Sequence, residues 1–164
     1  MKLIKSYLHR VFIDGLSGMA LGLFSTLIIV TIIQQIGTFA GGTVGNLIFL
    51  VGKMAAAATC AGIGVGVAYK FKESAMVVLS AATAGLVGGY ASQLLAGTVI
   101  SDSGALVLSG PGEPLGAFLA AYVGIELGHL ISGKTKLDII LTPLVTIGAG
   151  AAVGVRAGPP ISSF

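Results

Sequence analysis

Charged residues are scarce in this sequence of 164 residues. Nine residues are basic and six are acidic, and together they make up 9% of the chain. An ordinary soluble domain has about 25% charged residues, so these few side chains could not cover the surface of a soluble domain of this size. Trp is absent, and no basic patch with interleaved aromatic residues occurs. The composition therefore excludes a soluble globular domain, and we expect no nucleic-acid partner.

Motifs for catalysis and cofactor binding are also missing. The sequence holds no Walker loop, no nucleophile elbow, no HExxH and no G-x-G-x-x-G between a strand and a helix. The single cysteine, Cys60, lies inside an apolar run, where we expect a small buried hydrophobe rather than a disulfide framework or a metal cluster. We therefore expect no cofactor, no metal site and no intrinsic catalysis.

Hydrophobic residues are abundant, at 55% of the chain, and the mean hydropathy is +1.01. A membrane-spanning helix needs about 20 mostly apolar residues. Five segments meet this need, at residues 12–36, 44–69, 75–100, 115–132 and 139–157. Residues 1–10, with Ile4 and Leu8 at helical spacing, could form a short interfacial helix before the first segment. The sequence therefore predicts an all-α fold, a single polytopic membrane domain over residues 1–164 with five transmembrane helices.

Basic residues are distributed as in a membrane protein whose N-terminus is cytoplasmic. Seven of the nine precede the first segment or follow the second and the fourth: Lys2, Lys5, Arg10, Lys70, Lys72, Lys134 and Lys136. Of the other two, Lys53 lies within a span and Arg156 lies on the opposite side. The alternate loops, residues 37–43 and 101–114, contain no Lys or Arg. Since cytoplasmic loops carry an excess of positive charge, we expect the N-terminus inside and the C-terminus outside.

Glycines recur at a spacing of four residues in almost every segment. The pairs are Gly18/Gly22, Gly62/Gly66, Gly85/Gly89, Gly124/Gly128 and Gly150/Gly154. Such pairs lie on one helix face and let neighbouring helix backbones approach closely within lipid. They indicate a tightly packed helical bundle.

Residues 101–114, SDSGALVLSGPGEP, differ from an ordinary loop. A short apolar core is followed by Gly110, Pro111, Gly112 and Pro114, which break any regular helix. The stretch is too short to span a membrane, and broken backbone at membrane depth is tolerated only beside protein or a water-filled cavity. We expect a re-entrant hairpin here, with a structured external loop as the alternative.

Ionisable groups inside a membrane are costly, so each is a candidate for a site. Glu126 lies near the middle of the fourth segment, with His129 and Tyr122 on the same helical face. This stripe could bind a hydroxylated ligand or carry a proton, or Glu126 could instead make an interhelical bond, with Lys53 as a possible partner. Lys53, in the second segment, could also reach towards the interface or face a polar cavity. Glu113, between Gly112 and Pro114, could bind sugar hydroxyls or be a solvated loop acid.

Three stretches resemble a known family when they are taken together. They are SGMALGLFSTLIIVTIIQQIG at 17–37, GPGEPLGAFLAAYVGIELGHLISGKTKLDIILTPLVTIGAG at 110–150, and GPPIS at 158–162. They resemble the enzyme-IIC-like membrane proteins of the bacterial phosphotransferase system, in the branch that includes the PfoR-type regulator. GPGEPLGAF and SGKTKLDIILTP are the most specific parts, because their polar pattern is not generic for membrane segments.

The resemblance implies a multi-pass protein of the bacterial cytoplasmic membrane, at most the membrane subunit of a phosphotransferase-type sugar transporter. Members of the family are longer, so the chain resembles the N-terminal half of an inverted-repeat transporter. A second copy or a second half would then be its partner, beside the lipid bilayer.

Our leading interpretation is a membrane transport component for a small polar solute, a sugar above all. The candidate substrate-binding residues are Glu113, Glu126, His129, Lys53 and Gly112. The alternatives are a membrane-embedded ligand-sensing regulator without transport, and a homo-oligomeric membrane scaffold.

Overall fold

The computed structural model describes the backbone of residues 1–162 and the side chains of residues 1–157. Within these residues the chain forms helices and loops, and an isolated antiparallel bridge joins Ile100 to Leu106. The predicted all-α class is therefore confirmed. The third family-like stretch, at 158–162, lies outside the described side chains.

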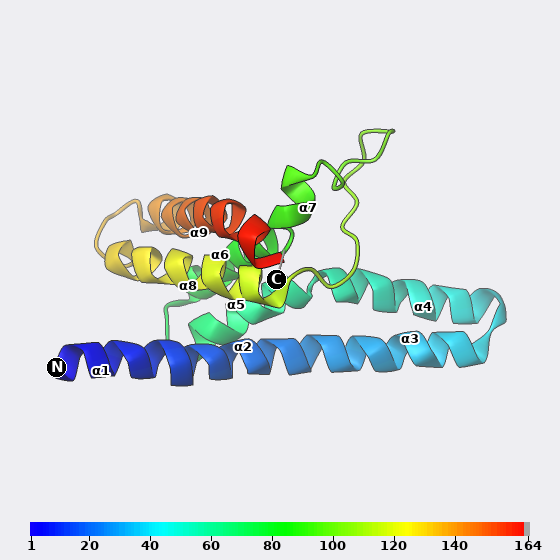
Figure 1. The fold of residues 1–164 in the computed structure, drawn as a ribbon, viewed down its shortest axis with the longest axis horizontal. Helices are drawn as coiled ribbons and strands as arrows, with labels where there is room; N and C mark the ends of the chain where they lie inside the picture. Colours follow the sequence, from blue (N-terminus) through cyan, green and yellow to red (C-terminus); the bar gives the residue numbers. More distant parts are fainter. Residues whose placement is uncertain (163–164) are drawn as a thin grey trace.

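The N-terminal forty residues form one long helical rod (Figure 1). It runs without a break through α1 (Lys2–His9), η1 (Arg10–Gly15), α2 (Leu16–Leu23), η2 (Phe24–Ile28) and α3 (Ile29–Ala40), where η1 and η2 are π-helical. The expectation of a separate interfacial helix before the first segment is therefore wrong, because α1 continues directly into the membrane-spanning helix. At about 1.5 Å per residue, the 39 residues of the rod extend well beyond the roughly 30 Å hydrocarbon core of a bilayer.

A tight turn reverses the chain after this rod. Gly41 and Gly42 have φ values of 60° and 62°, a left-handed conformation that glycine adopts without steric cost. The next helix, α4 (Gly42–Ala57), therefore runs back along α3, and the two form a hairpin that projects past the remaining helices (Figure 1). Large apolar side chains cover the outside of this hairpin, among them Ile32, Phe39, Leu50 and Met54.

The other helices are α5 (Thr59–Lys70), α6 (Ala75–Gly89), α7 (Ala91–Leu95), α8 (Pro114–Ile131) and α9 (Asp138–Ser162). Three helices in the described chain are long and apolar enough to cross a membrane: Lys2–Ala40, Pro114–Ile131 and Asp138–Ala157. A fourth crossing results if α4 and α5, which meet at a bend of 47°, form one broken span. The chain is thus a polytopic membrane protein.

The structure differs from the five predicted segments in two places. The second segment is broken at Ala58, inside a run of four alanines that carries no helix-breaking residue. In the third predicted segment the regular helix α6 ends at Gly89, and the chain turns at Tyr90. The short helix α7 follows and ends at Leu95. As α6 has only 15 residues, it is shorter than the length usual for a span, and a fifth crossing remains a prediction.

Small residues build the interior of the bundle. Its core contains Cys60, Ile63, Val67 and Ala81, together with residues of α8, and all four are fully buried. A Cβ atom added at Gly18 would lie 2.6 Å from the carbonyl oxygen of Gly66, so the backbones of α2 and α5 touch directly. The predicted tight glycine packing is confirmed here.

The same holds between the later helices. A Cβ atom at Gly124 of α8 would lie 2.5 Å from the carbonyl oxygen of Thr146 in α9, and one at Gly150 would lie 2.6 Å from that of Ala120. Because real Cβ atoms do not approach so closely, each of these positions requires glycine at the present helix spacing.

The basic segments gather at one end of the molecule. The N-terminus, the loop after α5 and the loop after α8 lie together there (Figure 1), and the hydroxyls of Ser74 and Ser132 in the two loops are 2.8 Å apart. The α3–α4 turn and the loop between α7 and α8 lie towards the other end. This arrangement is the one that the positive-inside prediction needs, while the orientation in a bilayer stays a prediction.

Candidate functional site

The stretch between α7 and α8, residues 96–113, is irregular backbone as expected from its glycines and prolines. Gly97, Gly104, Gly110 and Gly112 all have φ values between 71° and 78°. The stretch first projects away from the helices, turns at the Ile100–Leu106 bridge, and returns to the bundle as an extended arm (Figure 1). We call residues 109–113 the return arm. Its entry into the membrane as a re-entrant hairpin remains a prediction.

Several hydrogen bonds attach the backbone of the return arm to the bundle, and three of them involve Gly110, Pro111 and Glu113. The Tyr90 hydroxyl donates to the carbonyl of Gly110, the Cys60 thiol donates to the carbonyl of Pro111 at 3.1 Å, and the amide of Glu113 donates to the carbonyl of Gly89 at 2.7 Å. Cys60 is buried as expected, and it is also a polar anchor. The arm is therefore a fixed wall rather than a loose loop, although Ser109, Gly110 and Pro111 remain exposed on its outer side.

Gly112 fits this wall for two separate reasons. Its φ of 75° is in the left-handed region, and a Cβ atom there would lie 2.6 Å from the Cys60 sulfur. Glu113 follows as the residue before α8, and its carboxylate lies 3.4 Å from the hydroxyl of Ser92. Glu113 thus makes a local hydrogen bond at the start of a helix, where a negative charge is favourable.

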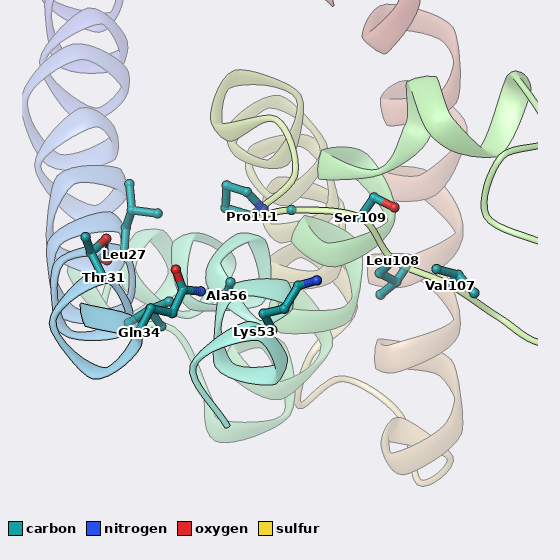
Figure 2. Close-up of a pocket in the computed structure, with 11 residues that line it drawn as sticks. Leu27, Thr31, Gln34, Lys53, Ala56, Val107, Leu108, Ser109 and Pro111 are labelled. Atoms are coloured by element: carbon teal, nitrogen blue, oxygen red, sulfur yellow. Dashed lines mark hydrogen bonds between the residues drawn. The ribbon is translucent and has the colours of Figure 1, made fainter. Parts of the chain in front are cut away.

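A cavity of about 380 Å³ opens beside the return arm. Figure 2 shows it between α3, which contributes Thr31 and Gln34, α4, which contributes Lys53 and Ala56, and residues 107–111. Its volume is in the range of about 300–1,000 Å³ that is usual for small-ligand sites. The break between α4 and α5 lies next to it, and in transporters such broken helices and irregular backbone form substrate sites.

Lys53 is the charged residue of this cavity. It lies eleven residues after Gly42, the first residue of α4, which is about 16 Å along the helix. In the predicted topology, with the α3–α4 turn at the outer surface, this depth is near the middle of a hydrocarbon core of about 30 Å. A Lys at such a depth costs about 2.5–3.5 kcal/mol. Among the described side chains no carboxylate lies within 4.0 Å of it.

Glu126 and His129 belong to a different part of the molecule. Glu126 pairs with Arg10, whose Nε lies 3.2 Å from its Oε1, so the suggested partnership of Glu126 with Lys53 is not found. Nδ1 of His129 lies 2.7 Å from Oε2 of Glu73, and Oε1 of Glu73 accepts a hydrogen bond from Nη2 of Arg10 at 3.0 Å. We call Arg10, Glu73, Glu126 and His129 the charge cluster.

The charge cluster links three elements: the N-terminal rod, the loop between α5 and α6, and the helix α8. Glu73 is its centre, with only 3% of its side chain exposed, whereas Arg10 is 32% exposed and Glu126 28%. The guanidinium of Arg10 also lies over the ring of Phe71, 4.5 Å from its centroid, in a cation–π contact. Tyr122, on the same stripe of α8, packs its ring edge-to-face against Phe71, with the ring centroids 6.0 Å apart.

The structure thus divides the predicted site residues between three places. Lys53 lines the cavity, Gly112 and Glu113 lie in or next to its wall, and Glu126 and His129 lie in the charge cluster, so a single site between the return arm and the Glu126 face does not form. Among the described residues no group of three His, Cys, Asp or Glu is placed to hold a metal ion.

Two members of the charge cluster, Arg10 and Glu73, are not among the site residues that the sequence predicts. The distribution of basic residues predicts Arg10 only as a topology signal, and no motif singles out Glu73. The signal that was present is the position of Glu73, the one acidic residue in a loop that follows Lys70 and Lys72.

Comparison with known proteins identifies the family. The family described as "Phosphotransferase system, EIIC" matches residues 13–164, which is nearly the whole chain. The chain belongs to this family. As a member of the phosphotransferase EIIC family with several apolar spans, it is a multi-pass membrane protein and a component of membrane transport. Neither the curated proteins nor the solved structures gave a match.

Proposed function

We propose that this EIIC-family chain carries a small polar solute, of the sugar class, across the bacterial cytoplasmic membrane. The observation that supports the proposal is the cavity of about 380 Å³ at the break between α4 and α5, bounded by the return arm. The proposed substrate contacts are Lys53, Gln34 and Thr31 in the cavity, with Gly112 and Glu113 holding the wall in place.

Polar groups in the cavity favour a hydroxylated solute over an apolar one. The Gln34 amide offers two donors and an acceptor, and its side chain makes no hydrogen bond with the described residues. It lies across Gly52 of α4, where a Cβ atom would meet its Cγ at 2.6 Å. The glycine therefore makes room for the Gln34 side chain against α4, and an amide with free donors and an acceptor suits the hydroxyl groups of a sugar.

Glu126 and His129 take a structural role in this proposal. Their partners are protein side chains from two other segments, and buried or half-buried charges paired in this way fix the relative positions of the elements that carry them. They act through the rod and α8, away from the solute.

A ligand-sensing regulator is the second candidate, because the same cavity would bind a solute in a protein that does not move it. The apolar outer face of the α3–α4 hairpin is consistent with lipid, a second copy or a second half of a transporter as its neighbour. A scaffold without ligand predicts that neither binding nor flux depends on the cavity.

Exchange of a labelled solute across the membrane of proteoliposomes tests the three hypotheses of transporter, sensor and scaffold. The purified chain would be reconstituted, loaded with unlabelled D-glucose, D-mannitol or D-gluconate, and supplied with the same labelled solute outside. We expect saturable exchange of at least one probe. Thr31→Phe, which fills the cavity from an exposed position, should abolish it, whereas Ile32→Phe, the next residue and also exposed but outside the cavity, should leave it intact.

Binding without exchange in the same preparation would favour the sensor. Equal behaviour of Thr31→Phe and Ile32→Phe would show that the cavity is not the solute site, provided that both variants keep the thermal midpoint of the parent chain.

A further inference from the structure

We infer that the cavity selects an anionic solute, a polyhydroxy acid whose carboxylate binds Lys53. The inference rests on the proposed function and specifies its substrate class. A charged group at membrane depth without a carboxylate partner is rare, and such groups mark substrate pathways. The question is therefore what compensates the charge of Lys53 when the site is in use.

The protein itself supplies no counter-ion among the described residues. The side chains that line the cavity include no Asp or Glu. The acidic residues Glu73 and Glu126 are already paired with Arg10, and Glu113 lies against Ser92. A carboxylate that enters with the solute would thus complete the one ion pair that the cavity leaves open.

The backbone of the return arm is already engaged elsewhere. The carbonyls of Ser109, Gly110 and Pro111 accept hydrogen bonds from Gln93, Tyr90 and Cys60 respectively. In Figure 2 the Lys53 side chain points from α4 towards this arm, with Gln34 and Thr31 on the opposite wall. One acceptor position of each carbonyl is thus in use, and the one carboxylate of the arm, that of Glu113, lies against Ser92.

The distribution of polar groups indicates the rest of the ligand. Gln34 and Thr31 lie on α3, across the cavity from Lys53, and both can bind hydroxyl groups. A molecule with a carboxylate at one end and hydroxyls along its length would meet the cation of α4 and the polar side chains of α3 at once. A neutral sugar would satisfy only the second set.

Matched pairs of probes test the inference. D-gluconate and D-glucitol share an open six-carbon polyol and differ in the carboxylate, and D-glucuronate and D-glucose are the corresponding ring forms. Affinities would be measured by titration calorimetry on the purified full chain in detergent. We expect the acid of at least one pair to bind at least tenfold more tightly than its neutral partner.

Variants of the lysine decide its role. Lys53→Met should remove the preference for the acid and leave the affinity for the neutral partner within about threefold, while Lys53→Arg, which keeps the charge, should retain most of the preference. Lys134→Met, at an exposed lysine in the loop after α8, should change nothing.

Three results overturn the inference. If a neutral probe binds as tightly as its acid, or if Lys53→Met keeps the preference, the anionic class is wrong, while binding that Thr31→Phe abolishes still supports a polar-solute site. If none of the four probes binds and none exchanges in proteoliposomes, the inference and the proposed function both fail.

Discussion

Replacing Arg10 by Met tests whether the charge cluster holds the bundle together. Arg10 pairs with Glu73 at 3.0 Å and with Glu126 at 3.2 Å, and methionine keeps much of the apolar stem while removing the charge. Glu73, which is 3% exposed, would then retain only His129 as a partner, and Glu126 would retain none. The variant therefore leaves one nearly buried carboxylate poorly compensated and a second one unpaired.

The expected loss of stability is about 3.5–4 kcal/mol. Removing one partner of a buried pair costs about 3–5 kcal/mol, and the low end applies because Arg10 and Glu126 are about one-third exposed. Loss of the contact with the Phe71 ring adds about 0.5–1 kcal/mol. For a chain of 150–250 residues, 1 kcal/mol shifts the thermal midpoint by about 2–4 °C, so the midpoint in detergent should fall by about 7–16 °C.

Lys5→Met is the matched control, because it removes the same charge from an exposed position five residues earlier on the same helix. Its effect should stay within about 0.5 kcal/mol. The double variant Arg10→Met/Glu73→Gln should be less destabilised than the sum of the single variants, since neutralising the carboxylate removes the penalty that the lost arginine creates. A midpoint for Arg10→Met equal to that of Lys5→Met, or strict additivity in the double variant, would refute this account.

Three further predictions concern the return arm, the cavity and the topology. Gly110→Ala should cost only the left-handed backbone strain of about 1–2 kcal/mol, since no atom lies within 4 Å of its Cβ position. Gly112→Ala should cost about 1–3 kcal/mol more through overpacking against the thiol behind it, and equal midpoints for the two variants would contradict the packing. Lys53→Met should keep or raise the thermal midpoint without ligand, because it removes an uncompensated charge; a clear fall would reveal a partner for the lysine. In a cysteine-free background, an impermeant thiol reagent added outside should label Asp102→Cys and miss Thr135→Cys, and labelling of the latter would reject the cytoplasmic N-terminus.

Much of the helical architecture could be predicted from the sequence, because lipid solvation leaves a strong signal in composition. Pro114 and Asp138 begin α8 and α9, one residue before the predicted starts, since both lie where polar loop residues give way to apolar ones. The break at Ala58 could not be predicted. Alanine is compatible with a continuous helix, and the bend appears only when α5 turns to bring its glycines against α2.

The candidate site could be predicted only in part for a similar reason. Lys53 and Gly112 were identified because a charge in an apolar run and a glycine between prolines are visible locally. The partners of Glu126 were not, because hydropathy indicates which residues lie in the membrane but not which helices are neighbours. Arg10 and Glu73 are 63 positions apart, and their contact depends on how the rod packs against the later helices.

The break at Ala58 has a mechanical consequence. The α3–α4 hairpin is attached to the bundle at two irregular points, the bend at Ala58 and the π-helical η2, and these lie at the same level, since Thr26 of η2 packs against Gly62 of α5. A rotation of the hairpin about this level would change the width of the cavity, because α3 and α4 form one side and the return arm the other, while the glycine contacts of α2 with α5 stay in place. The two attachments would then define the axis of a hinge. Spin labels on the α3–α4 turn and on α9 should accordingly show a broader distance distribution than a pair on α2 and α5, and equal widths would mean that the hairpin is rigid.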